Sequence, residues 1–326
     1  MLWKTLLTAG AAVVGVPLAI TAYLLAVEKG LGRLGRNTAG RLRPWLWLLP
    51  ALLLLAVFLL YPALNTISLS LRDAGSKGFV GLSNYLHIFG DRDMLIVLRN
   101  NLLWLVVFTA ATVVVGLLVA VLTDRVKYEA AAKAFIFLPM AISFVAAGVI
   151  WKLMYEFKPQ GTPQIGVVNA FLSAALPAFQ PKAWLFDRSI NNWALIAVGV
   201  WMWTGFAMVI LSAGLKGISG ELLEAARIDG AGELQVIFRI ILPLLRPTIV
   251  VVATTLVINV LKIFDIVYVM TNGALGTEVI ANRMYKEMFN FHDFGRASAL
   301  AVLLLLAIIP AMALNLRRFA RGRAGG

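Results

Sequence analysis

The chain contains no cysteine and only two histidines, His87 and His292, among its 326 residues. Without cysteine it can form neither a disulfide bond nor a catalytic thiol. The two histidines lie far apart in the sequence, which argues against a histidine-rich metal site. Charged residues are also scarce, at 14% of the chain, and this share is well below that of ordinary soluble domains. These absences exclude thiol chemistry and make a soluble metalloprotein a poor interpretation.

Apolar residues are what the chain has in abundance, at 61% of the total with a mean hydropathy of +0.87. An uncharged helix of roughly 20 residues crosses the hydrocarbon core of a bilayer. Only a structure whose backbone N–H and C=O groups are all hydrogen-bonded internally can do so. The sequence therefore predicts an all-α, polytopic membrane bundle of about seven transmembrane helices. The predicted spans are residues 2–27, 45–69, 95–122, 134–155, 193–215, 248–270 and 297–316.

The formal net charge is +13, which in a soluble protein would indicate nucleic acid as a partner. Here the arginines cluster beside the apolar runs, where they orient the chain and contact anionic membrane lipid, so we expect no nucleic-acid partner. One cation, Lys4, precedes the first apolar run and five follow it, the reverse of a secretory signal peptide. We expect a retained first helix with the N-terminus outside and the C-terminus in the cytoplasm.

Prolines predict where spans begin or bend. Pro44 is expected to open the second span, and Pro139 is expected to kink the fourth. The polar stretch 219–247 separates two spans. Ser219 is expected to cap a short helix there, and Gly230 to end it in a left-handed conformation. Pro243 is expected to end the second half of the stretch, so that the chain turns back into the membrane.

This polar stretch also carries a long spaced motif. It reads Glu224-Ala225-Ala226, three residues, Gly230, nine residues, and then 240–243 as Ile-Ile-Leu-Pro. The pattern resembles the cytoplasmic EAA loop of ABC-importer permeases at every defined position. Residues 79–85, 137–151 and 264–273 extend the resemblance, so that residues 60–316 look like the larger, maltose-type sugar permease, and particularly like alpha-glucoside permeases.

The resemblance implies a type I importer core and a set of partners. It implies a second EAA-bearing permease, a homodimeric cytoplasmic ATPase, an extracytoplasmic sugar-binding protein and an oligosaccharide substrate such as maltose, trehalose or sucrose. The chain has no Gly-x-x-x-x-Gly-Lys-Ser/Thr phosphate loop, so ATP and Mg²⁺ are expected on the separate ATPase and no cofactor on this chain. The expected location is the bacterial cytoplasmic (inner) membrane, and no enzymatic activity is expected of this chain.

The EAA loop supplies the candidate coupling residues. A carboxylate on an exposed docking helix can accept charge-assisted hydrogen bonds from a partner, which makes Glu224 the first candidate. A solvated surface carboxylate is its plainer interpretation. The full set expected to contact the ATPase is Leu223, Glu224, Ala225, Ala226, Asp229 and Gly230.

A sugar path needs aromatic faces for the pyranose ring and polar groups for its hydroxyls. The resemblance places Trp201 and Phe206 where maltose-type permeases have substrate-facing aromatics, and Thr204 lies between them. For the neighbouring Trp203, packing or lipid contact is the favoured interpretation. Span six adds three polar residues that are costly at membrane depth. They are Asn259, Lys262 and Asp265.

Lys262 and Asp265 have two open interpretations, a structural ion pair on one helix face or direct binding of sugar hydroxyls. The family's own polar substrate residues on this helix fall opposite Leu256, Val260 and Ile263, which departs from a strict maltose-type pocket. An intramembrane enzyme would need clustered carboxylates, histidines or metal ligands. An ion-coupled secondary transporter would show inverted repeats and coupling carboxylates. Neither set of features is present in the sequence.

The predicted organisation has three parts and no separate soluble domain. Residues 1–44 form an additional N-terminal transmembrane helix and a cytoplasmic linker. Residues 45–316 form the transmembrane permease domain, with the EAA loop at 216–247. Residues 317–326 form a basic cytoplasmic tail.

Overall fold

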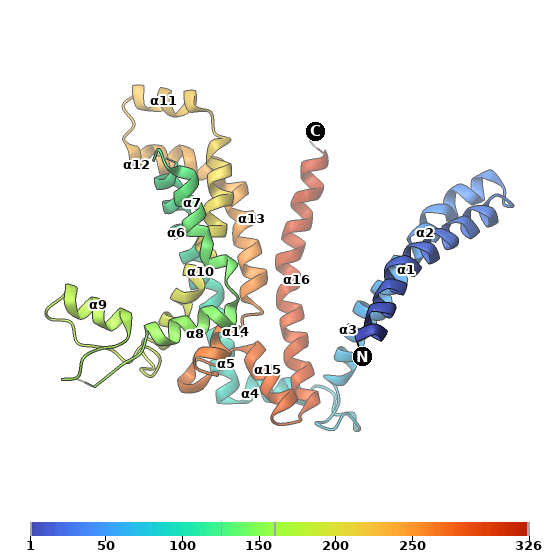
Figure 1. The fold of residues 1–326 in the computed structure, drawn as a ribbon, viewed down its shortest axis with the longest axis horizontal. Helices are drawn as coiled ribbons and strands as arrows, with labels where there is room; N and C mark the ends of the chain where they lie inside the picture. Colours follow the sequence, from blue (N-terminus) through green and yellow to red (C-terminus); the bar gives the residue numbers. More distant parts are fainter. Residues whose placement is uncertain (1, 125, 160, 325–326) are drawn as a thin grey trace. The chain divides into compact units, whose positions relative to one another are not determined.

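A computed structural model describes residues 2–124, 126–159 and 161–324, and it is helical almost throughout (Figure 1). Among these residues the only β-pairing is one isolated bridge between Arg72 and Phe79. The chain divides into two compact units, residues 1–66 and 67–326. The predicted all-α membrane bundle is confirmed.

The first unit is a helical hairpin. It contains α1 (Leu2–Leu31), α2 (Arg36–Leu55), the π-helical turn η1 (Ala56–Leu60) and the start of α3 (Tyr61–Leu69). The Glu28 carboxylate of α1 accepts hydrogen bonds from Arg43 and from the Trp47 indole, each at 2.9 Å. Pro44 lies inside α2 rather than at its start, so the prediction that Pro44 opens this span was wrong.

The second unit begins with short helices and then a long span. Its helices are α4 (Ser83–Gly90), α5 (Arg92–Leu103), η2 (Trp104–Phe108), α6 (Thr109–Thr123), α7 (Glu129–Phe137), η3 (Leu138–Ala141), α8 (Phe144–Met154) and α9 (Val167–Ala175), followed by α10 (Asn191–Lys216), α11 (Gly220–Ile228), α12 (Glu233–Val236), η4 (Ile237–Ile241), α13 (Leu242–Val260), α14 (Asp265–Met270), η5 (Ala274–Gly276), α15 (Ile280–Phe289) and α16 (Phe294–Ala324).

Among the described residues, five continuous helices are long and apolar enough to cross a membrane. A sixth segment, α7–η3 with α8, passes the same test but bends by 99°, and the apolar part of α16 is a seventh, shorter segment. The bend contains Pro139, and Ser143 then caps α8 by accepting a hydrogen bond from the Ala146 amide at 3.1 Å. The predicted kink is therefore confirmed, and it is sharp enough to break the span.

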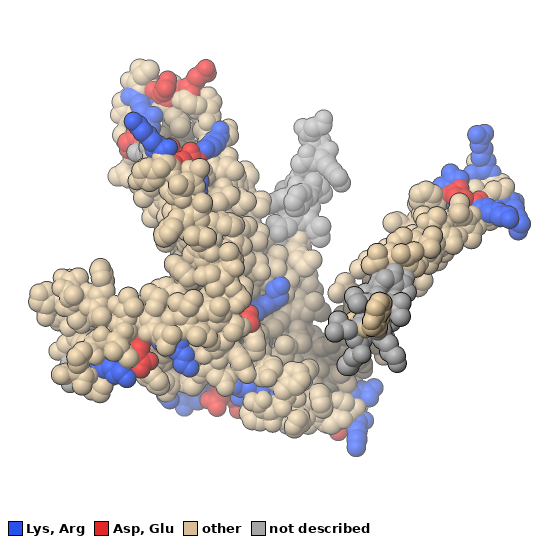
Figure 2. Space-filling model, viewed as in Figure 1, with Lys and Arg blue, Asp and Glu red and all other residues tan. Residues whose placement is uncertain are grey.

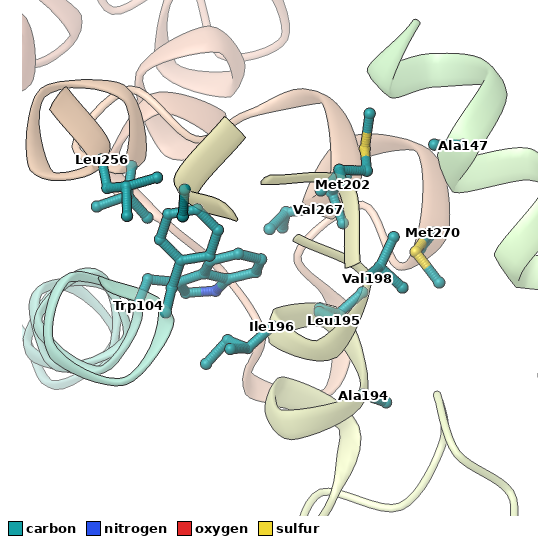
Figure 3. Close-up of a cluster of buried hydrophobic side chains, with 14 of the residues drawn as sticks. Trp104, Ala147, Ala194, Leu195, Ile196, Val198, Met202, Leu256, Val267 and Met270 are labelled. Carbon is teal, nitrogen blue, oxygen red and sulfur yellow. The ribbon is translucent and has the colours of Figure 1, made fainter. Parts of the chain in front are cut away.

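Helix α10 is the centre of the second unit, because it packs against α6, α7, α8, α13 and α14. Close approach to α6 and α7 depends on glycine. A Cβ on Gly116 would lie 2.5 Å from that of Ala207, and a Cβ on Gly205 would lie 2.7 Å from the Phe137 Cα. Figure 3 shows the apolar core around α10, in which the buried Trp104 faces side chains of α10 and Leu256.

The sixth predicted span differs from expectation at both ends. Residues 233–260 form one helix that continues through Pro243, because the π-helical turn η4 precedes the proline and accommodates its missing N–H. The helix then breaks at residues 261–264 before α14 begins at Asp265. The predicted stop at Pro243 was wrong, and the single span 248–270 is two helices.

Charged side chains gather at the two ends of the second unit in Figure 2. One end carries α11 and α12, the other carries α4, α8 and α15, and on the face shown few charged side chains lie between them. A band of this kind is expected where lipid surrounds a bundle.

Candidate functional site

Helix α11 lies at one end of the second unit, next to α12 (Figure 1). Gly230 ends it with a φ of +86°, as predicted. This left-handed conformation is strained for any residue that has a side chain. Ser219 occupies the N-cap position, as predicted, but its side chain forms no capping hydrogen bond. A helix of nine residues is marginal alone and depends on packing to persist.

Only one side of α11 packs against its own chain. Leu223 and Ala226 contact the small apolar cluster formed by Val236, Ile241 and Leu245. The remaining apolar residues of the helix are uncovered, with Ile228 85% exposed and Leu222 46% exposed. Glu224, Ala225, Asp229 and Gly230 are exposed as well. The chain therefore presents an apolar and acidic surface here that it does not itself cover.

An ion pair fixes α11 against α12. The Arg227 guanidinium donates to the Glu233 carboxylate at 2.8 Å, and this carboxylate raises the pKa of Arg227 above its already high ordinary value. Both side chains are about half exposed, so the contact orients the helix more than it stabilises the fold. Arg227 thus turns inward along its own loop, while Glu224 carries no ion pair within the described part of the chain.

A polar network that the sequence did not reveal lies at the base of this loop. The Lys133 ammonium of α7 contacts the Asp124 carboxylate at 2.5 Å, the Glu129 carboxylate at 2.6 Å and the Ser212 hydroxyl. Ser212 of α10 also donates to Asp124 at 2.7 Å, and Lys216 contacts Glu129 at 2.5 Å. The network joins α6, α7 and the end of α10 from which the loop leaves. Only the Glu129–Lys133 spacing of four residues signals it in the sequence.

We expect Lys133→Met to lower the free energy of unfolding by about 2 kcal/mol, because it leaves the Asp124 carboxylate without a cation in this network and Glu129 with Lys216 alone. The Lys133 side chain is only 16% exposed. Lys127→Met is the matched control, since Lys127 is exposed and forms no ion pair among the described residues. Thermal unfolding of the detergent-purified variants measures the difference, and equal midpoints would contradict a structural role for the network.

Five of the six candidate sugar-path residues line one of two cavities. Trp201 and Thr204 line a cavity of about 720 Å³ between α6, α7 and α10, whose other lining residues are apolar. The Thr204 hydroxyl donates to the Val200 carbonyl at 2.7 Å, so its hydrogen is already used within α10. The Trp201 ring meets the Trp151 ring edge-on at 5.5 Å. This cavity offers almost no hydrogen-bonding group to a sugar.

The second cavity, of about 290 Å³, lies at the helix break between α13 and α14. Asn259, Lys262 and Asp265 all line it, and so does Trp203. Lys262 and Asp265 form no ion pair within the described chain, so the structural bridge is not found. The Asn259 amide donates to the Thr255 carbonyl at 2.9 Å. The break thus turns three polar side chains toward one aromatic-walled space.

Trp203, for which packing was the favoured interpretation, forms the aromatic wall of this second cavity. Its ring stacks on Phe144 at 6.3 Å and meets Phe206 edge-on at 5.5 Å. Phe206 therefore contacts this wall and does not line the cavity itself. Trp203 also packs against the apolar core, as the sequence favoured. Its place in the cavity lining depends on how α8 and α14 pack around α10, which no local pattern reports.

Residues 112–319 match the family model described as "Binding-protein-dependent transport system inner membrane component". The matched region contains α11, the Lys133 network and every lining residue of the two cavities except Ala111 and Phe108.

Two curated relatives are similar over most of the chain. The osmoprotective compounds uptake permease protein GgtC of Synechocystis sp. is 56% identical over 274 residues, which is 84% of this chain and 98% of that protein. The alpha-glucoside transport system permease protein AglF of Rhizobium meliloti is 46% identical over 288 residues, or 88% of this chain and 85% of that protein.

The fold is also similar to a chain in the crystal structure of a bacterial ABC transporter involved in the import of the acidic polysaccharide alginate. The TM-score is 0.71 over 87% of this chain and 99% of that chain, with 23% identity. At this identity the likeness establishes the architecture alone.

Proposed function

Because the chain belongs to the family of binding-protein-dependent transport system inner membrane components, and is thus a multi-pass membrane permease subunit, we propose that it carries neutral oligosaccharides of the alpha-glucoside type inward. The observation that carries the proposal is the cavity at the break between α13 and α14. There the Trp203 ring lines the same cavity as the Asn259 amide and the charged groups of Lys262 and Asp265, which form no ion pair among the residues described.

Sugar recognition explains this combination of side chains. The ring of Trp203 offers a flat apolar face to a pyranose, and Asn259, Lys262 and Asp265 offer both donors and acceptors to its hydroxyls. Charged groups at membrane depth normally face a bundle interior or water, as they do here. The alpha-glucoside permease among the relatives supports this substrate class, while the more identical relative is named for osmoprotective compounds.

Energy for transport comes from outside the chain in this proposal. Helix α11 docks through Leu222, Glu224 and Ile228 onto a homodimeric cytoplasmic ATPase, which binds ATP and Mg²⁺. A second EAA-bearing permease completes the translocation path, and an extracytoplasmic binding protein delivers the sugar. What supports the docking is the exposure of an apolar and acidic helix face at the charged end of the bundle. In this orientation the end with α11 is cytoplasmic and the chain's C-terminus lies inside.

The test is ATP-driven uptake of trehalose, maltose and sucrose by the complete complex, purified with its partner subunits and reconstituted in liposomes with its binding protein. Uptake of at least one of these sugars that requires ATP is the expected result. Uptake that requires an ion gradient and no ATP would contradict the proposal.

Trp203→Ala is expected to lower sugar uptake more than Trp201→Ala does. Losing one aromatic face costs about 1.5 kcal/mol of sugar binding, which is a change in apparent affinity of about tenfold. The two variants remove the same side chain from the same helix, two residues apart, so they are matched controls for each other. A larger loss in Trp201→Ala would place the path in the cavity between α6, α7 and α10.

A further inference from the structure

A third cavity lies at the end of the second unit opposite α11, and its volume is about 640 Å³. The end of α8, α14 and the segment after α14 line it, together with two residues before α10. Its aromatic lining comes from Tyr155, Phe157, Phe186 and Tyr268. The size is within the range of small-molecule sites. None of the coupling or sugar-path residues considered above belongs to it.

The aromatic wall of this cavity is fixed in place. Tyr268 is 39% exposed, its ring stacks on Phe264 at 5.0 Å, and Tyr285 meets it edge-on at 5.4 Å. Phe264 lines the cavity at the helix break, so the stacked pair has one ring in each cavity. A ring whose face is held against neighbours offers a binding surface that loses little entropy on contact.

Polar groups accompany the aromatic rings. Lys152, Glu156 and Asn272 line the same cavity. The Glu156 carboxylate also lies 3.5 Å from the Lys158 ammonium, in a half-exposed ion pair. Lys152 forms no ion pair in the described residues. The lining thus holds one cation and one carboxylate, together with an amide that can both donate and accept. This balance suits a neutral polyol more than an anion.

Buried asparagines hold the loop after α14, which forms one wall of the cavity. The Asn191 amide donates to the Leu275 carbonyl at 3.0 Å, and the Asn192 amide to that of Gly276 at 3.2 Å. The Asn100 amide donates to the carbonyl of Gly276 at 2.7 Å and to that of Glu278 at 2.9 Å. All three asparagines are less than 9% exposed.

These bonds hold an unusual backbone. Leu275 has a φ of +55° and Asn272 a φ of +49°, and residues with side chains adopt such angles rarely. Such conformations persist where the surroundings fix them, and they cluster at functional sites. The loop is therefore a rigid wall for the cavity rather than a flexible cover.

We propose that this outer cavity is a staging site for one pyranose ring of a neutral saccharide, occupied before the ring reaches the cavity at the helix break. The inference rests on the proposed function for its direction, because that orientation puts the cavity on the extracytoplasmic side. Helix α14, with six residues, spans about 9 Å between the two cavities. The stacked Phe264 and Tyr268 rings make an aromatic surface continuous from one cavity to the other.

The absence of cysteine gives a direct test on the complete complex. Ala274→Cys places a thiol in the lining of the cavity, and Ala178→Cys places one at an exposed position outside it, as the matched control. Labelling by a membrane-impermeant maleimide is followed on this chain by mass spectrometry, with trehalose as the probe. At about four times the trehalose concentration that gives half-protection, Ala274→Cys is expected to react about fivefold more slowly, and Ala178→Cys at an unchanged rate.

Substitutions at Tyr268 distinguish trehalose binding in this cavity from an indirect effect of trehalose on the labelling rate. In the Ala274→Cys background, Tyr268→Ala is expected to abolish the protection and Tyr268→Phe to retain it, because the ring face and not the hydroxyl does the binding. Trehalose uptake is measured on the same liposomes. Trehalose uptake without protection of Ala274→Cys from labelling overturns the staging site and leaves the proposed function standing. If the liposomes take up none of the three sugars, the proposed function itself is contradicted. Equal protection at both positions also overturns the site.

Discussion

Glu224→Lys lowers ATP-driven sugar uptake by about tenfold or more in our account, with membrane insertion unchanged. Glu224 is exposed on α11 and forms no ion pair in the described chain, so its carboxylate is available to a partner. A hydrogen bond to a charged group contributes about 1.5 to 3 kcal/mol, and reversing the charge replaces attraction with repulsion. The measurement is initial uptake by reconstituted complexes, together with the ATPase activity of the same preparation.

Glu221→Lys is the control for this prediction, since it makes the same charge change one turn earlier on the same helix. It should reduce uptake less than Glu224→Lys. Normal uptake by the Glu224→Lys variant would remove Glu224 from the coupling surface, and an equal loss in both variants would assign the effect to the net charge of the helix.

Gly205→Leu is expected to destabilise the second unit by about 3 kcal/mol or more, the upper end of what overpacking costs. A Cβ at this position would lie 2.7 Å from the Phe137 Cα and 2.8 Å from the Ile136 carbonyl oxygen. Both neighbours are backbone atoms of α7, so no side-chain rotation relieves the clash. Helix α10 must then separate from α7, and Lys133 loses its contact with Ser212. The yield and thermal midpoint of the purified variant measure the effect.

Gly40→Leu is the matched control, because Gly40 also lies inside a helix but nothing lies within 4 Å of its added Cβ. Replacing an exposed helical glycine by a good helix former is neutral or stabilises by up to about 1 kcal/mol. If Gly205→Leu were as stable as Gly40→Leu, the contact between α7 and α10 would not be close-packed in the protein.

Local chemistry was enough to predict much of this molecule. The apolar runs locate the spans because a segment that crosses lipid must satisfy its own backbone hydrogen bonds, and a helix of about 20 apolar residues does so. Pro139 predicts the break in the fourth span, and Gly230 predicts the left-handed end of α11, since each residue restricts or frees its own backbone. The spaced EAA motif identified the family that the matched model then showed.

Features that depend on distant contacts could not be predicted. The break at 261–264 occurs in an apolar stretch with neither glycine nor proline from 248 to 270, so nothing local signals it. Which cavity Trp203 lines depends on which helices pack around α10. The Lys133 network joins residues up to 88 positions apart, and pairing across that distance has no signature in one sequence. Pro243 misled because a π-helical turn accommodates it.

The measurement that most directly tests the central claim is site-specific crosslinking from α11. A photoreactive residue at Ile228, which is 85% exposed, is irradiated in native membranes, and the captured protein is identified by mass spectrometry. Phe171 on α9, 69% exposed, is the control position. We expect Ile228 to capture an ATPase subunit with a phosphate-binding loop and Phe171 not to capture it. If Ile228 captures only lipid, or Phe171 captures the same ATPase, α11 is not the coupling helix.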